Sequence, residues 1–150
     1  EIHVSHSMRT LMNKNKYSVG INEAFDRVIR ECGKCNHRNE EDGAWLGDNI
    51  IEAYTALHDQ GFAASVEVWD NETDELVGGL YGVTIGKVFI GESMFSLVPS
   101  ASKLALIFLA RYLKEHGGKM IDCQLETSHL KSMGGRYISY EEYMKIMNEE

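Results

Sequence analysis

The change of hydrophobic period along residues 63–126 constrains the fold of this chain more than any other feature. The segment 63-AASVEVWD-70 alternates as a β-strand does, and residues 75–85 and 87–95 continue as strands after short turns. Such short connections predict an antiparallel meander. Residues 101–117 then carry the strongest helical pattern, and 119-KMIDCQLE-126 follows as a further strand. A strand, a helix and a strand in this order predict a right-handed parallel crossover.

Helices are expected to flank this sheet. Residues 22–32 and 45–61 space their apolar side chains at helical intervals, and Asn22 is expected to cap the first helix. The polar stretch between them, residues 33–43, is expected to be a surface loop, and residues 128–150 two short helices. The expected fold class is therefore α+β, with a mixed, mainly antiparallel sheet and flanking helices.

Composition restricts the classes of function. An apolar fraction of 43% and a charged fraction of 25% are ordinary for a globular protein, so residues 1–150 are expected to form a single domain. The apolar run 104–110 is far shorter than a membrane span, and no secretion signal is recognisable, so no membrane partner is expected. The net charge of −8 argues against general nucleic-acid binding. However, residues 1–20 hold three cations, Arg9, Lys14 and Lys16, against Glu1.

The three cysteines do not indicate a metal or redox site. The run 32-CGKCNH-37 contains Cys32 and Cys35, but no second ligand pair follows at a spacing that zinc requires. Redox pairs normally open a helix after a strand, whereas this pair closes a predicted helix. We therefore expect no metal, and we interpret these cysteines, with Cys123, as structural or incidental.

Acidic and amide side chains interrupt two of the predicted strands. Glu92 follows Gly91, and Asp122 and Gln124 share one face of the strand at 119–126. If these strands are parallel neighbours, the three side chains gather near the strands' carboxyl ends, where ligands bind in sheets with crossover helices. Capping of helices, or pairing with Lys and Arg, is an equally good explanation of the two acids.

The stretch 91-GESMFSLVPSASK-103 is compatible with a loop that binds phosphate at a helix N-terminus. It lacks every glycine-rich phosphate fingerprint. N-acetyltransferases have a similar order of strands and helix, but they hold the coenzyme A pyrophosphate on a glycine-rich turn, where this chain has Ser-Ala-Ser-Lys. Coenzyme A is therefore not expected.

Several strings together resemble the leucyl/phenylalanyl-tRNA–protein transferase family. They run in order along the chain: 52-EAYTALHDQGFAASVEVW-69, 77-VGGLYGV-83, 89-FIGESMFS-96, 101-ASK-103 and 121-IDCQ-124. The resemblance implies a bacterial cytoplasmic enzyme with an acetyltransferase-like catalytic domain and no cofactor. It would transfer Leu, Phe or Met from charged tRNA to the N-terminal Arg or Lys of proteins, which then enter N-end-rule degradation. The family's additional N-terminal domain has no counterpart in this sequence.

The resemblance also implies roles for single residues. Asp122 and Gln124 would act together on the attacking amine, and Glu92 would hold the basic N-terminal residue or orient the ester. Arg9, Lys14 and Lys16 would contact tRNA phosphates, although His6, Thr10 and Asn13 stand where the family is usually basic. The implied aminoacyl and adenosine site consists of Trp45, Tyr54, Leu80, Phe89, Leu106, Leu113 and Ile121.

Alternatives remain open at this point. Simple core packing is an alternative for the whole apolar set and the better one for Leu106 and Leu113. Another acyl- or aminoacyltransferase of this fold could act on a different amine. A protein that binds basic peptide N-termini without catalysis would also fit. Ala64 and Ser100, which replace a usual His and Asn, put tRNA binding in more doubt than the acidic centre.

Overall fold

A computed structural model describes residues 6–36, 48–118 and 120–123 of the chain. One five-stranded sheet has its strands in sequence order: β1 (Tyr17–Ile21), β2 (Ala63–Asp70), β3 (Leu76–Ile85), β4 (Val88–Ser96) and β5 (Met120–Cys123). The pairs from β1 to β4 are antiparallel, whereas β4 and β5 are parallel. The predicted mixed, mainly antiparallel sheet is therefore confirmed, and β2, β3 and β4 match their predicted bounds within one residue.

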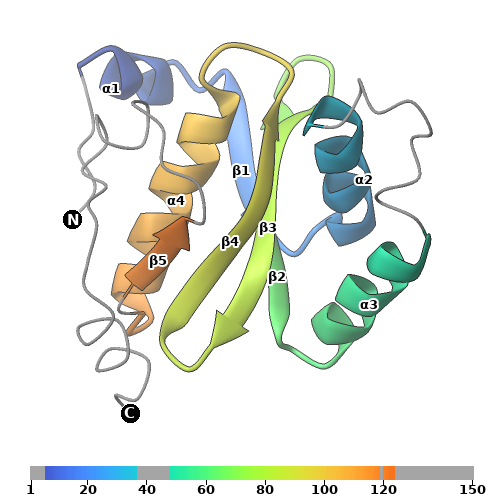
Figure 1. The fold of residues 1–150 in the computed structure, drawn as a ribbon. Helices are drawn as coiled ribbons and strands as arrows, with labels where there is room; N and C mark the ends of the chain where they lie inside the picture. Colours follow the sequence, from blue (N-terminus) through green and yellow to red (C-terminus); the bar gives the residue numbers. More distant parts are fainter. Residues whose placement is uncertain (1–5, 37–47, 119, 124–150) are drawn as a thin grey trace.

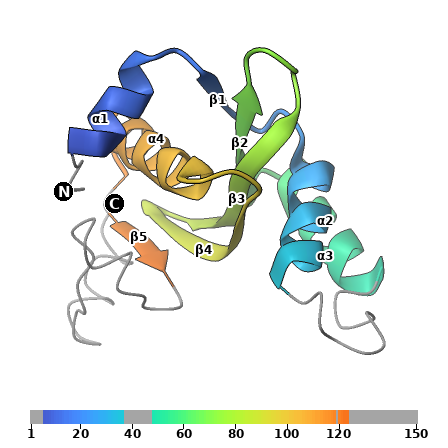
Figure 2. The same ribbon diagram turned by 90° about the horizontal axis from the view of Figure 1, so that it is seen from above.

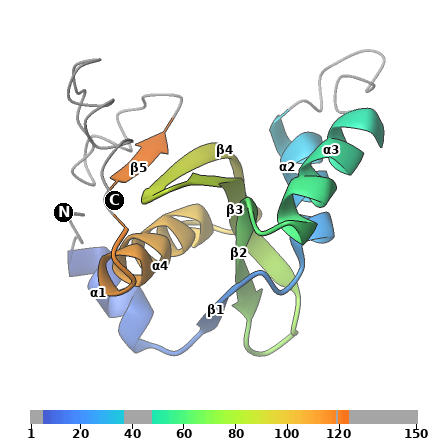
Figure 3. The same ribbon diagram turned by 90° about the horizontal axis from the view of Figure 1, so that it is seen from below.

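Helices cover both faces of the sheet (Figures 1, 2 and 3). On one face lie α2 (Phe25–Asn36) and α3 (Asp48–Asp59), and on the other lie α1 (His6–Asn13) and α4 (Ala101–Glu115). Helix α4 follows β4 and leads into β5, so it is the predicted crossover. The flanking helices expected for this fold class are thus present on both faces.

Each face of the sheet has its own hydrophobic core. On the α4 side, Val66, Val68 and Leu80 pack against the apolar side of α4. On the α2 side, Phe25, Val28, Ile29 and Cys32 of α2 pack with Ile51, Tyr81 and Phe95. Helix α4 approaches the sheet closely because β3 has no side chain at Gly78, where an added Cβ would lie 2.5 Å from the Cβ of Ala101. Removing water from these two apolar surfaces is the main stabilising term of such a domain.

At the N-terminal side two elements were missed and two predictions were wrong. Helix α1 and strand β1 were not predicted, because α1 makes only about two helical turns and β1 only about two strand repeats, which are too few for a clear period. Asn22 does not cap α2: its φ is +58°, and its side-chain oxygen accepts the N–H of Ser65. Helix α2 begins at Phe25 and continues to Asn36, so residues 33–36 are helical instead of forming a loop. Tertiary packing of the buried Cys32 outweighs the helix-breaking tendency of Gly33.

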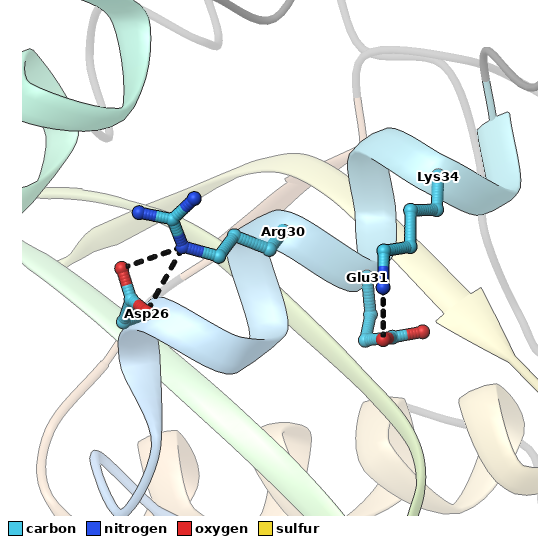
Figure 4. A network of polar contacts seen from close by, with 4 residues as sticks. All are labelled: Asp26, Arg30, Glu31 and Lys34. Atoms are coloured by element: carbon cyan, nitrogen blue, oxygen red, sulfur yellow. Dashed lines mark hydrogen bonds and ion pairs between the residues drawn. The ribbon is translucent and has the colours of Figure 1, made fainter. Parts of the chain in front are cut away.

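Local ion pairs occupy the exposed side of α2 (Figure 4). Arg30 Nε lies 3.0 Å from Asp26 Oδ2, and Lys34 Nζ lies 3.4 Å from Glu31 Oε1. Pairs at these helical spacings stabilise a helix only slightly when they are exposed. These charges are therefore explained without a ligand. The predicted loop beyond residue 36 and the predicted tail helices at 128–150 lie outside the described residues.

Candidate functional site

Glu92 lies on a β-bulge of β4. In the register of β3 and β4, Gly82 is opposite Gly91 and Tyr81 is opposite Ser93, so Glu92 has no partner residue on β3. A bulge re-aims the side chain that it carries and bends its strand. Gly82 permits the close approach of β4 here, because an added Cβ would lie 2.2 Å from the carbonyl oxygen of Ile90. The chain thus presents Glu92 as an exposed carboxylate on β4, the strand between β3 and the edge strand β5.

Tyr54 of α3 contacts this carboxylate directly. Its hydroxyl donates a hydrogen bond of 2.5 Å to Glu92 Oε1. The Tyr54 ring packs edge-on against Tyr81, with 5.4 Å between the ring centroids, and Tyr81 is buried beneath it. Glu92 therefore points to the sheet face that α2 and α3 cover, and the packed rings of Tyr54 and Tyr81 lie beside it.

The two tyrosines are held in their protonated form. Burial, the hydrogen bond to Glu92 and the negative charge of Glu92 together raise the pKa of Tyr54 to about 12, and burial is the largest of the three causes. Burial also raises the pKa of Tyr81 far above its usual value, with smaller contributions from Cys32, Tyr54 and Glu92. At neutral pH, Tyr54 is therefore the donor and Glu92 the acceptor.

Asp122 lies on the same face as Glu92. In the parallel pair of β4 and β5, Asp122 is opposite Ile90, two residues before Glu92. Its neighbour Ile121 packs into the α4-side core, and adjacent residues of a strand point to opposite faces. Asp122 thus points away from α4, toward the side on which Tyr54 contacts Glu92. Gln124, the third predicted member, lies outside the described residues.

The predicted aminoacyl site divides between the two faces of the sheet. Leu80, Phe89 and Leu106 are buried in the α4-side core, and Leu113 and Ile121 pack against it, whereas Tyr54 is on the opposite face. A pocket of about 130 Å³ opens beside this core, with Phe89, Leu113, Lys87 and His116 among its lining residues. Core packing accounts for the five aliphatic and aromatic side chains, and their contact with a substrate stays a prediction. Trp45 lies outside the described residues.

The predicted tRNA contacts are on the surface near the first strand. Arg9 is exposed on α1, and Lys14 and Lys16 are exposed just before β1. Lys16 Nζ lies 5.6 Å from the centroid of the Tyr17 ring. Strand β1 is one edge of the sheet and β5 is the other. The role of Arg9, Lys14 and Lys16 in binding RNA stays a prediction.

Sequence reasoning missed a buried polar network next to this site. Ser65 and Glu67 are both fully buried. Glu67 accepts hydrogen bonds from the Ser65 hydroxyl and, at 3.0 Å, from the backbone N–H of Glu23. The alternation of β2 does place Ser65 and Glu67 on one face, but only the helices covering that face bury it. Tyr81 was also missed, since nothing in its own stretch indicates contact with Tyr54.

Among the residues that the structure describes, no three His, Cys, Asp or Glu side chains lie close enough together to hold a metal ion. In the same part of the chain, no helix is both long and apolar enough to cross a membrane.

Comparison with known proteins shows a match along nearly the whole sequence. The family model for leucyl/phenylalanyl-tRNA protein transferase matches residues 1–148. The enzyme of that name from Flavobacterium johnsoniae is 49% identical over 150 residues, which are 100% of this chain and 69% of the relative. Those from Nitrosomonas eutropha and Hydrogenovibrio crunogenus are both 46% identical, over 99% and 98% of this chain and 62% and 56% of the relatives. The chain thus spans from 56% to 69% of the length of these three curated relatives.

Solved structures show the same fold at low sequence identity. An aminoglycoside acetyltransferase from an uncultured soil metagenomic sample, in complex with sisomicin, has a TM-score of 0.57 at 9% identity. The match covers 91% of this chain and 90% of the acetyltransferase. A ribosomal-protein-alanine N-acetyltransferase from Brucella melitensis has a TM-score of 0.50 at 12% identity, over 72% of this chain and 79% of the other. The expected acetyltransferase-like fold is therefore confirmed.

Proposed function

This chain belongs to the leucyl/phenylalanyl-tRNA–protein transferase family, and on that premise we propose that it transfers Leu or Phe from aminoacyl-tRNA to proteins that begin with Arg or Lys. The observation that carries the proposal is the family match over residues 1–148. Residues 1–150 would form the catalytic domain, which would act in the cytoplasm and mark its acceptors for N-end-rule degradation. Coenzyme A has no part in the proposed reaction.

The proposed reaction is an aminolysis of an ester. The α-amine of the acceptor attacks the ester carbonyl, a C–N bond forms, and the C–O bond to the terminal ribose of the tRNA breaks. One proton leaves the attacking nitrogen, and the ribose oxygen gains one. Because the ester is already activated, the protein contributes mainly the positions of the two substrates and the stabilisation of charge in the transition state.

Glu92 and Asp122 are suited to the cationic partner in this reaction. Both acids face the same side of adjacent parallel strands, and Glu92 is exposed. Glu92 would hold the basic N-terminal residue, with its carboxylate oriented by the Tyr54 hydroxyl. Asp122, acting through Gln124, would draw charge or a proton away from the attacking amine. Two carboxylates on one face favour a protonated N-terminus over a neutral or acidic one.

The other predicted contacts complete the proposal. The apolar set at Leu80, Phe89, Leu106, Leu113 and Ile121 would receive the Leu, Phe or Met side chain, and an apolar pocket discriminates only weakly between these. Trp45 and Tyr54 would stack on the terminal adenosine. Arg9, Lys14 and Lys16 would contact tRNA phosphates.

The experiment is transfer of labelled Leu from Leu-tRNA to three peptides at low salt. One peptide begins with Arg, one begins with Asp, and one begins with N-acetylated Arg, which has no free amine. Labelling of the first peptide alone supports the proposal. A second reaction replaces Leu-tRNA with labelled acetyl-coenzyme A. Acetylation in that reaction, without transfer of Leu, would show an acetyltransferase instead.

A further inference from the structure

Helix α3 is attached to the sheet by two polar side chains that lie one helical turn apart. Tyr54 donates to Glu92 on β4, and four residues later His58 contacts Asn22, the residue that follows β1. Residues at this spacing lie on the same side of a helix. Both attachments are therefore on the side of α3 that faces the sheet, where Ile51 and Leu57 also pack.

The contact of His58 has a defined direction. His58 Nε2 lies 3.2 Å from Asn22 Oδ1, and the same oxygen accepts the backbone N–H of Ser65 at 3.0 Å. An atom that accepts a backbone N–H must be the amide oxygen, so His58 Nε2 must carry the hydrogen. The His58 ring also stacks on Phe25, with 4.3 Å between the centroids and 15° between the planes. The imidazole is thus fixed both at its edge and across its face.

Asn22 is itself held rigidly. Its φ of +58° lies in the left-handed region, which Asn tolerates better than most residues. Its backbone N–H donates to the carbonyl oxygen of Ser65 at 2.9 Å. The fully buried Ser65 in turn donates through its hydroxyl to Glu67, which is fully buried as well. The anchor for His58 is therefore a polar network without access to solvent at its base.

We infer that His58 and Asn22 are positioning residues: their hydrogen bond docks the end of α3 on the sheet, so that Tyr54 orients the Glu92 carboxylate toward the acceptor. The hydrogen bonds from His58 to Asn22 and from Tyr54 to Glu92 are present without a substrate. Only the expected effect on the KM values rests on the proposed function. Neither His58 nor Asn22 needs to touch a substrate. Loss of their hydrogen bond should weaken the binding of the basic acceptor more than the binding of the aminoacyl-tRNA.

Three variants separate the contributions. His58→Phe keeps an aromatic ring on Phe25 and loses the donor. His58→Gln keeps an N–H at similar reach and loses the ring. Asn22→Gly keeps the left-handed backbone and loses the acceptor oxygen. Glu52→Gln, at an exposed position of the same helix, is the matched control.

Two readouts are measured on each variant. The first is the KM for the Arg peptide and the KM for Leu-tRNA. The second is the pKa of the Tyr54 hydroxyl from ¹³Cζ-tyrosine NMR, assigned by comparison with Tyr54→Phe. It needs no catalysis, so it tests the docking even if the chain proves not to transfer Leu.

We expect His58→Phe and Asn22→Gly each to raise the KM for the Arg peptide roughly 5- to 10-fold, the effect of losing one hydrogen bond. The KM for Leu-tRNA should rise less, since stacking on the Tyr54 ring is only one of the proposed tRNA contacts. In both variants the pKa of Tyr54 should fall from about 12 toward 10, and the double variant should be no worse than either single one. His58→Gln should raise the KM for the Arg peptide less than His58→Phe does. A Tyr54 pKa that stays near 12 in His58→Phe and Asn22→Gly, or additive effects in the double variant, would overturn the inference.

Discussion

At the scale of single residues, the contact between Tyr54 and Glu92 is what turns a surface carboxylate into a positioned group. An exposed Glu on a strand samples several rotamers, and this one is restrained by a hydroxyl donor from a helix 38 residues away in the sequence. The donor stays protonated because burial and Glu92 itself raise its pKa. Orientation of a carboxylate before its partner arrives reduces the entropy that binding must overcome.

The Tyr54→Phe variant tests this contact with little change of shape. It removes only the hydroxyl and leaves the edge-on packing against Tyr81. Hydrogen bonds to a charged group contribute about 1.5–3 kcal/mol, so we expect kcat/KM for the Arg peptide to fall roughly 10- to 100-fold. Tyr112→Phe, at an exposed position of α4, is the control. An unchanged kcat/KM in Tyr54→Phe would show that Glu92 needs no orientation.

The same tyrosines make stability depend on alkaline pH. Their folded-state pKa values are raised, with that of Tyr54 at about 12, while an unfolded tyrosine loses its proton near pH 10. Above pH 10 the folded state therefore binds more protons than the unfolded state, and the free energy of unfolding falls as pH rises. The contribution of Tyr54 is complete below pH 10 and is lost as pH rises through about 12.

Denaturant unfolding between pH 9 and pH 12 measures this loss. We expect a smaller decline in Tyr54→Phe than in the unaltered chain, since one of the raised groups is gone. If the free energy of unfolding falls equally steeply with pH in the two proteins, the assignment of a raised pKa to Tyr54 is contradicted.

At the scale of elements, the docking of α4 on the sheet depends on a residue with no side chain. Gly78 leaves room for Ala101 at the start of α4, and a Cβ there would lie 2.5 Å from the alanine Cβ. We expect Gly78→Ala to lower the free energy of unfolding by about 1–3 kcal/mol, the usual cost of overpacking. Gly91→Ala is the matched control, because its new Cβ would meet only the carbonyl oxygen of Asp122 at 3.6 Å. If Gly78→Ala lowers the free energy of unfolding no more than Gly91→Ala does, α4 can shift away from the sheet without cost.

The elements that sequence reasoning found are those with a long, regular period. Strands β2, β3 and β4 and helix α4 were predicted nearly to the residue, because alternation and helical spacing continue over eight residues or more. Helix α1 and strand β1 were missed because their burial comes from packing against the rest of the fold. The first residues of the predicted loop are helical for the same reason, since Cys32 is buried.

The candidate site was predictable to a similar degree. The parallel pairing of β4 and β5 was predicted from the crossover, and with it that Glu92 and Asp122 lie on neighbouring strands. The bulge at Glu92 and the bond from Tyr54 were not predictable, because both depend on how elements pack in three dimensions. Glu67 was overlooked because an acid on an alternating strand normally faces water.

At the scale of the whole molecule, charge is unevenly distributed over an acidic chain. The net charge is −8, yet Arg9, Lys14 and Lys16 are close in sequence and all exposed. Contacts to phosphate release counterions, so each one makes binding to RNA more sensitive to salt. A basic region of three side chains predicts a modest slope of affinity against salt concentration.

The Lys14→Ala and Lys16→Ala variants test this region. If each lysine contacts one phosphate, each change should reduce the slope of log Kd for tRNA against log salt by about 1 or somewhat less. Lys34→Ala, on the solvated side of α2, should leave the slope as it is. Slopes that are the same in all four proteins would place tRNA on another surface.

The central claim is that the acids on β4 and β5 carry out aminoacyl transfer, and a single-turnover measurement tests it most directly. Leu-tRNA and the Arg peptide are mixed with excess protein, either unaltered or carrying Asp122→Asn, and the binding of each substrate is measured in parallel. We predict transfer by the unaltered chain and a loss of roughly 100-fold or more in Asp122→Asn, the effect of removing a group that assists proton transfer, with both substrates still bound. Equal transfer rates in the two proteins would contradict the claim and place the chemistry elsewhere in the molecule.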